Sequence, residues 1–368
     1  MSRIVDTFLD LARIPSPTGR EAGVAEYVAR ELSALGFTVR FDETQQITGS
    51  DSGNLIATLP ATVPGMCVAF AAHMDCVDPC EGVEPVLEGG VIRTAGDTVL
   101  GGDDKVGVAA MIEAAKRLAE SGEPHAELRL LFTVSEEQGL IGAKALSPED
   151  ASADVCLVLD ADGAVGGIVT AAPTHYTFEA TFTGRAVHAG VEPEKGVSAI
   201  VIASAAIAGM ELGRLDDHST ANIGTIAGGS ATNVVAPTCM VTGECRSLDR
   251  RRVEAVREAM DGAMRDAATA HGGAVEVAWT LAYEGFVVPA DAPAAALVEA
   301  ACADIEVESR MFATGGGSDA NVFAALGVPA LVLASGMAKV HSTDEELEVV
   351  QLERLADLII ALIRRAVA

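Results

Sequence analysis

Short apolar runs that end at charged residues recur along the first half of the chain. Three of them are MCVAFAA at 66–72, LRLLFTV at 128–134 and DVCLVL at 154–159, and each is followed by a histidine or a carboxylate. Runs of this length without alternation are typical of strands buried on both faces of a parallel sheet. Helix-like stretches separate them, as at 105–121. The pattern predicts an α/β domain with a mostly parallel sheet flanked by helices.

Amphipathic helices are expected at both ends of the chain. At 3–13 apolar residues recur at helical spacing between Asp6 and Arg13, and Pro15 halts the pattern. This stretch does not have the composition of a secretion signal, and no run approaches the ~20 apolar residues of a transmembrane helix. The last helix is expected at 349–366. Further helices of the outer segments are expected at about 21–35, 292–303 and 318–326.

The pattern of apolar and polar positions changes at about residue 167. Residues 175–184, HYTFEATFTG, alternate apolar with polar positions, as a half-buried strand does. The elements expected after this strand are strands near 221–227, 238–246 and 274–281 and helices near 195–213 and 250–271. They predict a two-layer α+β domain inserted at 167–284. The segments 1–166 and 285–368 would then form one discontinuous catalytic domain.

Charge and cysteine usage limit the partners and the compartment. The chain has 25 Lys and Arg against 53 Asp and Glu, a formal net charge of −28. Nucleic acid and anionic membranes would be repelled, so neither is expected as a partner. The seven cysteines include no C-x-x-C pair, and several lie in apolar runs, as buried free thiols do. A reducing cytoplasm is therefore expected.

Side chains with catalytic potential follow the apolar strands. His73 and Asp75 close the first strand, where a carboxylate two residues on can orient the imidazole. Glu136 and Glu137 close the second, at the rim of the sheet where α/β folds place their sites. Asp103 or Asp104 could cap the helix at 105–121, but two consecutive aspartates exceed what a cap requires.

These residues, with two from the later parts of the chain, have the composition of a metal centre. Histidine and carboxylate ligands suit zinc, or cobalt or manganese under other supply conditions. Five ligands fit two metals if Asp103 bridges them, and Glu136 would then stay unbound as a general base. The expected ligands are His73, Asp103, Glu137, Asp160 and His341.

The motifs around these residues, in this order, identify a resemblance. They include AAHMDCV, GGDDKVGVAAM, VSEEQGLIGA, LVLDADG, GRAVHAG, TGGGSDANVF and VHSTDEE. The chain resembles the co-catalytic di-zinc metallopeptidases of peptidase T, glutamate carboxypeptidase and aminoacylase, and is most similar to peptidase T-like enzymes. The resemblance implies the ligand roles above, an orienting role for Asp75, and a cis peptide bond after Asp103. Asp162 is the alternative to Asp160, because LDADG offers both.

The resemblance also implies roles for the inserted domain. In such enzymes this domain serves as a lid and a dimerisation surface, so a homodimer is expected. His188 matches the lid histidine that contacts the scissile carbonyl. Asn233 and Arg246 match residues that hold polar and carboxylate groups of the substrate. Gly316 and Gly317 could present backbone N–H groups to an anion at a helix start.

Three functions remain open from the sequence. The first is a zinc-dependent aminopeptidase acting on short peptides such as tripeptides, with Glu136 activating a metal-bridging water. The second uses the same chemistry on N-acyl amino acids, or on peptides as a glutamate carboxypeptidase-like enzyme. The third is a metal-binding homologue without catalysis, which the intact Glu136 and Asp75 disfavour.

Overall fold

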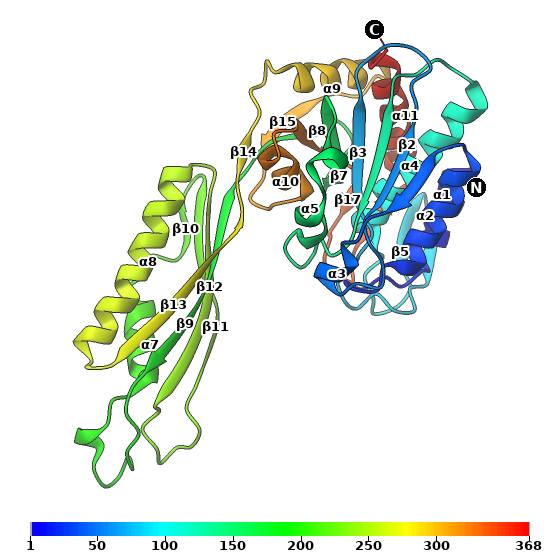
Figure 1. Ribbon diagram of the computed structural model, residues 1–368. Helices are drawn as coiled ribbons and strands as arrows, with labels where there is room; N and C mark the ends of the chain where they lie inside the picture. The colour runs from blue at the N-terminus through cyan, green and yellow to red at the C-terminus, as the bar shows by residue number, and fades with distance from the viewer. Residues whose placement is uncertain (1, 368) are drawn as a thin grey trace. The chain divides into compact units, whose positions relative to one another are not determined.

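The computed structural model describes residues 2–367, which divide into two units (Figure 1). Unit 1 runs to Ala171 and includes Val287–Ala313 and Ser318 onward, and unit 2 contains Ala172–Phe286 with Thr314–Gly317. The insertion was expected to begin at residue 167. Strand β8 (Gly167–Ala172) instead pairs with β16 (Ala330–Ala334) in the large sheet. Because of this pairing, the first residues of β8 belong to unit 1.

Unit 1 is built on a nine-stranded sheet with the order β1-β2-β6-β3-β7-β16-β8-β14, and β15 also pairs with β8. Its four central strands, β6, β3, β7 and β16, are parallel, so the predicted mostly parallel sheet is confirmed. The strands not yet delimited are β1 (Thr38–Phe41), β2 (Leu55–Leu59), β3 (Val68–His73), β6 (Leu128–Thr133), β7 (Val155–Ala161), β14 (Phe286–Val287) and β15 (Arg310–Ala313).

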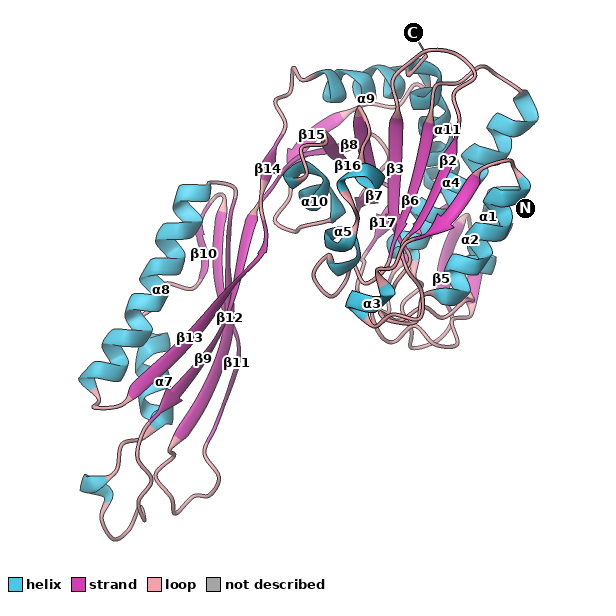
Figure 2. Ribbon diagram, viewed as in Figure 1, coloured by secondary structure: helices cyan, strands magenta, loops and turns pink. Residues whose placement is uncertain are grey.

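Helices cover both faces of this sheet (Figure 2). Leu157 and Leu159 of β7 point into the core shared with α4 (Gly102–Ser121), α1 (Arg3–Ala12) and α11 (Val349–Arg365). The alternate residues of β7 face α10 (Asp319–Ala325) on the other side. The remaining helices of unit 1 are α2 (Ala22–Ala34), α3 (Gln45–Thr48), α5 (Ile141–Ala145), α6 (Pro148–Ala151) and α9 (Pro293–Asp304).

Helix α4 is the central helix of unit 1, and its composition permits that position. Its first half, from Val106 to Ala115, is completely buried and consists mostly of small side chains, which allow close approach to the strands. Its one buried acid there, Glu113, binds Arg3 of α1 and Arg117 one turn further along. A buried carboxylate needs such partners, because an unpaired charge in the interior is costly.

A small sheet that the sequence did not predict lies in unit 1. Its order is β17 (Met337–Ala338), β18 (Glu346–Glu348), β5 (Val91–Thr94) and β4 (Pro85–Glu88). Its strands are too short for a clear periodic signal in the sequence. The pairing of β5 with β18 ties the region after His73 to the segment that carries His341.

Unit 2 has the predicted two-layer α+β architecture. Its antiparallel sheet has the order β10-β11-β12-β9-β13, and α7 (Ala199–Ala208) and α8 (Arg250–Ala270) cover one face. Phe178, Ala180 and Phe182 of β9 belong to the core shared with these helices, whereas the alternate residues Glu179 and Thr181 are more exposed. The remaining elements are β9 (Thr174–Thr183), η1 (Pro193–Lys195), β10 (Gly213–Asp216), β11 (Ser219–Gly228), β12 (Thr238–Ser247) and β13 (Ala274–Tyr283). Between residues 2 and 367 no helix is long and apolar enough to cross a membrane.

Candidate metal centre

The expected metal ligands converge at one rim of the large sheet in unit 1. His73 is the last residue of β3, Asp160 is the last but one of β7, and Glu137 follows the end of β6 by four residues. Since β3, β6 and β7 are parallel neighbours, their carboxyl ends meet at the same edge. Asp103 is the second residue of α4, and His341 lies between β17 and β18.

Asp103 stands between the two histidines. Its Oδ1 lies 3.0 Å from Nε2 of His73, and its Oδ2 lies 3.1 Å from Nε2 of His341. Asp160 approaches the first imidazole at 3.7 Å, and Glu137 approaches the second at 3.0 Å. Asp103 therefore lies between the pair His73–Asp160 and the pair His341–Glu137, the position a bridging carboxylate requires, and donor atoms of His73, Asp103 and Glu137 also lie within 4.8 Å of one another.

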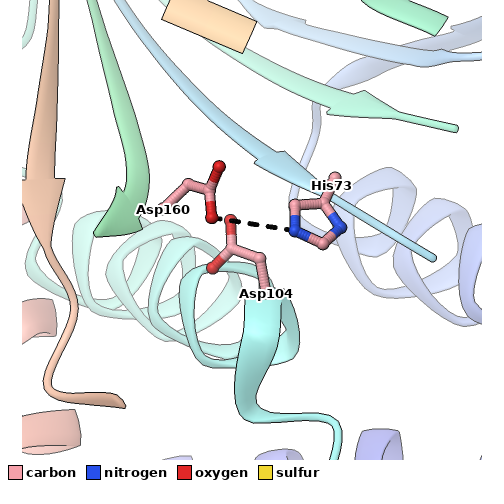
Figure 3. Close-up of side chains that lie close together, drawn as sticks. All are labelled: His73, Asp104 and Asp160. Atoms are coloured by element: carbon pink, nitrogen blue, oxygen red, sulfur yellow. Dashed lines mark ion pairs between the residues drawn. The ribbon is translucent and has the colours of Figure 1, made fainter. Parts of the chain in front are cut away.

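The rim holds a further carboxylate whose role the sequence did not reveal. Asp104 is fully buried, and its donor oxygen lies within 4.8 Å of donor atoms of His73 and Asp160. Figure 3 shows the carboxylates of Asp104 and Asp160 both directed toward the imidazole. Oδ1 of Asp104 accepts a hydrogen bond from the N–H of Gly107, whereas Oδ2 has no hydrogen-bond partner among the described residues. Asp104 thus makes a capping contact with one oxygen, and its other oxygen lies uncompensated beside the expected ligands. The two consecutive aspartates were the feature of the sequence that pointed to this residue.

The peptide bond between Asp103 and Asp104 is cis, as the family resemblance implied. Glu345 holds the chain just before it. The buried Glu345 carboxylate accepts hydrogen bonds from the N–H of Gly101 at 2.8 Å and of Asp103 at 3.0 Å. Glu345 lies in the VHSTDEE motif, but its distance of 242 residues from Asp103 concealed this contact from sequence reasoning.

Asp75 lies against His73, where its predicted orienting role requires it. Nδ1 of His73 lies 3.0 Å from the backbone oxygen of Asp75 and 3.4 Å from its Oδ1. Because both atoms are acceptors, the neutral ring carries its hydrogen on Nδ1 and presents the lone pair of Nε2 to the ligand cluster. The Asp75 carboxylate also accepts the N–H groups of Glu136 and Glu137 and the hydroxyl of Thr18.

Glu136 is the unbound carboxylate of the site. Its side chain belongs to neither ligand group, and the residue is 9% exposed. Burial, and then the charge of Asp160, raises the pKa of Glu136 well above its ordinary value. A carboxyl group whose pKa is raised suits a group that accepts and returns a proton.

The ligands differ in their protonation. Burial and the charge of Asp103 raise the pKa of Asp160 to about 8. Hydrogen bonds that His341 donates to the carboxylates of Asp103 and Glu137 raise the pKa of His341 to about 10. Burial alone would raise the pKa of Asp103, but contacts with both histidines outweigh it and hold that pKa well below its usual range. Bound protons therefore offset part of the negative charge of this cluster. Divalent cations would offset the same charge, and imidazole nitrogens and carboxylate oxygens are ligands that suit such cations.

Asp162, the alternative ligand, lies outside the cluster. It is exposed and lines a groove with residues of the 306–313 segment and Arg354. Asp160 is part of strand β7, whereas Asp162 lies beyond its last residue, Ala161, where the strand has ended.

Unit 2 places His188 and Asn233 on adjoining segments. His188 forms an isolated bridge with Val234, and the N–H of Ala189 donates to the backbone oxygen of Asn233 at 2.9 Å. Both residues are exposed. Their proximity within unit 2 brings together two motifs that are 45 residues apart in the chain.

Arg246 is already engaged by neighbours in unit 2. Its Nε and Nη2 donate to the two oxygens of Glu244, and its Nη1 donates to Tyr283 and to the backbone of Gly315. A substrate carboxylate that binds the Arg246 guanidinium, as predicted, would therefore share this group with Glu244. The N–H of Gly316 donates to Thr314, and a Cβ at Gly317 would lie 2.2 Å from the Tyr283 ring. Close packing thus explains the glycine at position 317. The contact of Gly316 and Gly317 with an anion stays a prediction.

Comparison with known proteins identifies the family of the chain. Residues 69–365 match the model of Peptidase family M20/M25/M40. Protein YqjE of Bacillus subtilis (strain 168), described as uncharacterised, is 43% identical over 99% of this chain and 98% of its own length. The crystal structure of aminopeptidase PepT from Bacillus cereus ATCC 10987 is 41% identical with a TM-score of 0.92, covering 99% of this chain and 98% of its own. A tripeptidase from Staphylococcus aureus subsp. aureus Mu50 is 35% identical with a TM-score of 0.95, covering 98% and 97%.

The chain belongs to Peptidase family M20/M25/M40. It is a metallopeptidase of that family, and the predicted similarity to peptidase T-like enzymes is confirmed.

We expect the affinity of the metal-free protein for divalent metal to rise with pH across the neutral range. At pH 7 Asp160, with a pKa of about 8, retains a proton, and His341, with a pKa of about 10, is charged. Both must lose a proton to bind a cation, so binding should release protons. Calorimetric titration with Zn²⁺ in buffers of different ionisation enthalpy would count them. An Asp162→Asn control should release the same number, and binding without proton release at pH 7 would contradict the expectation.

Proposed function

We propose that this chain is a di-metal aminopeptidase that removes the N-terminal residue from short peptides, tripeptides above all. The observation that carries the proposal is the position of Asp103, whose two oxygens face the imidazoles of His73 and His341. The similarity to the B. cereus aminopeptidase and the S. aureus tripeptidase supports the choice of substrate.

Each residue of the centre has a role in this proposal. One cation would be held by His73, Asp103 and Asp160, and the other by Asp103, Glu137 and His341. Two such cations, when bound, polarise a substrate carbonyl and lower the pKa of water. Glu136 accepts the proton of the attacking water on its carboxylate and delivers it to the nitrogen of the leaving amine, so that the amide bond breaks without net proton loss.

The buried setting of Glu136 supports this role. An exposed glutamate of ordinary pKa is a weak base near neutrality and does not retain the proton that the leaving amine must receive. Burial and the neighbouring Asp160 raise the pKa of Glu136, so its carboxylate takes up and holds that proton more readily. Asp75 contributes by holding His73 and the backbone of Glu136 at once.

Residues of unit 2 are proposed to contact the substrate. His188 would donate a hydrogen bond to the oxygen of the scissile carbonyl, where negative charge develops. Asn233, on the adjoining segment, would bind a polar group of the peptide. Arg246 would bind a carboxylate in competition with Glu244, and Gly316 and Gly317 would contribute backbone N–H groups.

The proposal extends to the cofactor, the assembly and the compartment. Zinc is the proposed metal, two ions per subunit, with cobalt or manganese as the alternatives that the same ligands accept. Metal analysis of the protein as purified from its host would distinguish them. A homodimer through unit 2 is proposed, which sedimentation would test. The seven cysteines, all free thiols and six of them buried, support a reducing cytoplasm.

A substrate screen tests the proposed reaction. With Zn²⁺, Co²⁺ or Mn²⁺ supplied, we expect tripeptides to be cleaved after their first residue, with a free amino acid and a dipeptide as the products resolved by chromatography. Tripeptides with an acetylated N-terminus should react far more slowly. Release of a C-terminal glutamate would instead indicate a glutamate carboxypeptidase-like enzyme, and hydrolysis of N-acyl amino acids would indicate an amidohydrolase.

Replacing the proposed base separates catalysis from metal binding. Glu136→Gln keeps the size of the side chain but cannot take up the proton, so kcat should fall about 10²- to 10⁴-fold. The variant should still bind two metal ions per subunit, measured by elemental analysis. Glu43→Gln, an exposed control, should behave as wild type. Turnover at the normal rate by a metal-loaded Glu136→Gln variant would refute the mechanism.

The role of His188 predicts a selective loss of rate. Removal of one donor to a developing oxyanion reduces kcat by about 10²- to 10³-fold in comparable sites, so His188→Ala should lose activity on that scale. His218→Ala is the matched control, because His218 is also an exposed histidine of unit 2. Equal kcat values for the two variants in steady-state assays would remove His188 from the substrate site.

A further inference from the structure

A second buried carboxylate holds the loop that carries Glu136. Glu21 is the residue before α2 and is fully buried, yet its side chain does not cap that helix. An acid at a helix start ordinarily accepts the N–H groups of the first turn. The carboxylate of Glu21 is directed instead toward two segments that are distant in the sequence, at Ser50 and Ser135.

The contacts of Glu21 concentrate on Ser135. Its Oε1 accepts the N–H of Ser135 at 3.0 Å and the hydroxyl of the same residue at 3.4 Å. The same oxygen accepts the N–H of Gly19 at 2.9 Å, and Oε2 accepts the hydroxyl of Ser50. Every oxygen of this buried carboxylate is thus satisfied, as an interior charge requires.

Ser135 needs this support because of its backbone conformation. Its φ is +53°, a left-handed conformation that costs a residue with a Cβ free energy and persists only where surrounding contacts impose it. Ser135 immediately precedes Glu136, so its backbone angles set the direction in which the chain enters the catalytic glutamate. A relaxed Ser135 would redirect the Glu136 side chain.

Two carboxylates together fix the backbone of this turn. Glu21 holds the N–H of Ser135, and Asp75 holds the N–H groups of Glu136 and Glu137 at 3.0 and 3.2 Å. Three consecutive backbone donors are therefore bound by two buried acids. Thr18, three residues before Glu21, also donates to Asp75 at 2.8 Å, so the loop before α2 supports both.

We propose that Glu21 is a positioning residue of the peptidase reaction, which fixes the backbone of Ser135 and thereby the orientation of the Glu136 carboxylate without contacting substrate or metal. The inference rests on the proposed role of Glu136 as the proton acceptor. Small displacements of a reacting group can cost up to about 10²-fold in rate, and a loss confined to kcat is the expected signature.

The test compares substitutions of Glu21 with two matched controls. Glu21→Ala should lower kcat about 10- to 100-fold, leave KM within about threefold and retain two metal ions per subunit. Glu21→Gln keeps an oxygen that can accept the Ser135 N–H, so it should recover most of the lost rate. Ser50→Ala removes the contact to Oε2 but leaves Ser135 untouched, and Glu26→Ala changes an exposed acid of the same helix. Both controls should keep the wild-type kcat.

Each outcome decides the proposal. A kcat within twofold of wild type for Glu21→Ala would overturn it, as would a loss of rate that only follows loss of metal, or a rise in KM at constant kcat. If Glu21→Ala does not fold, Glu21→Asp takes its place, because a side chain one methylene shorter withdraws the carboxylate from the N–H of Ser135 and should lower kcat in the same selective way.

The Glu136→Gln variant, measured in parallel, separates this inference from the proposed function. If Glu136→Gln is inactive while Glu21→Ala turns over normally, only the positioning role fails. If Glu136→Gln retains turnover, the proposed function itself fails.

Discussion

The crowding of carboxylates around two imidazoles at the carboxyl rim of one sheet is the constraint on which the rest of unit 1 depends. Asp103, Asp104, Glu136, Glu137 and Asp160 meet there in a largely buried setting, where like charges repel strongly and water cannot screen them. The raised pKa values of Asp160 and Glu136 and the raised pKa of His341 are the response of the protein to that crowding. Such a site is unfavourable for stability by itself and is explained by cation binding.

The surrounding structure holds these groups against their mutual repulsion through buried acceptors for backbone N–H groups. Glu345 binds the chain at Gly101 and Asp103, and Asp75 binds it at Glu136 and Glu137. In each case the acceptor comes from a segment that is remote in the sequence. The ligands are thus anchored through their main chain, so their side chains remain directed toward the centre.

Much of this arrangement could be predicted from local patterns. The parallel strands β3, β6 and β7 are short, mostly apolar runs, and a charged residue at or just after the end of such a run marks the rim of the sheet. The ordered motifs placed the five ligands and Glu136 without reference to structure. Asp104 was visible as a doubled aspartate, but its burial and its unpartnered oxygen could not be read from the pattern. The β4–β5 hairpin and strand β8 were missed, because strands of four to six residues with mixed polarity resemble loops.

The sequence by itself determined the class of fold, the two-layer insertion and the set of residues able to bind metal, because apolar periodicity and the spacing of motifs are local properties of the chain. Only the tertiary structure decided which carboxylate oxygen faces which imidazole, that Arg246 is paired with Glu244, and that Glu21 reaches Ser135. These contacts join residues through the packing of strands and loops or through the direction of a side chain. Neither is encoded in residue type and spacing alone.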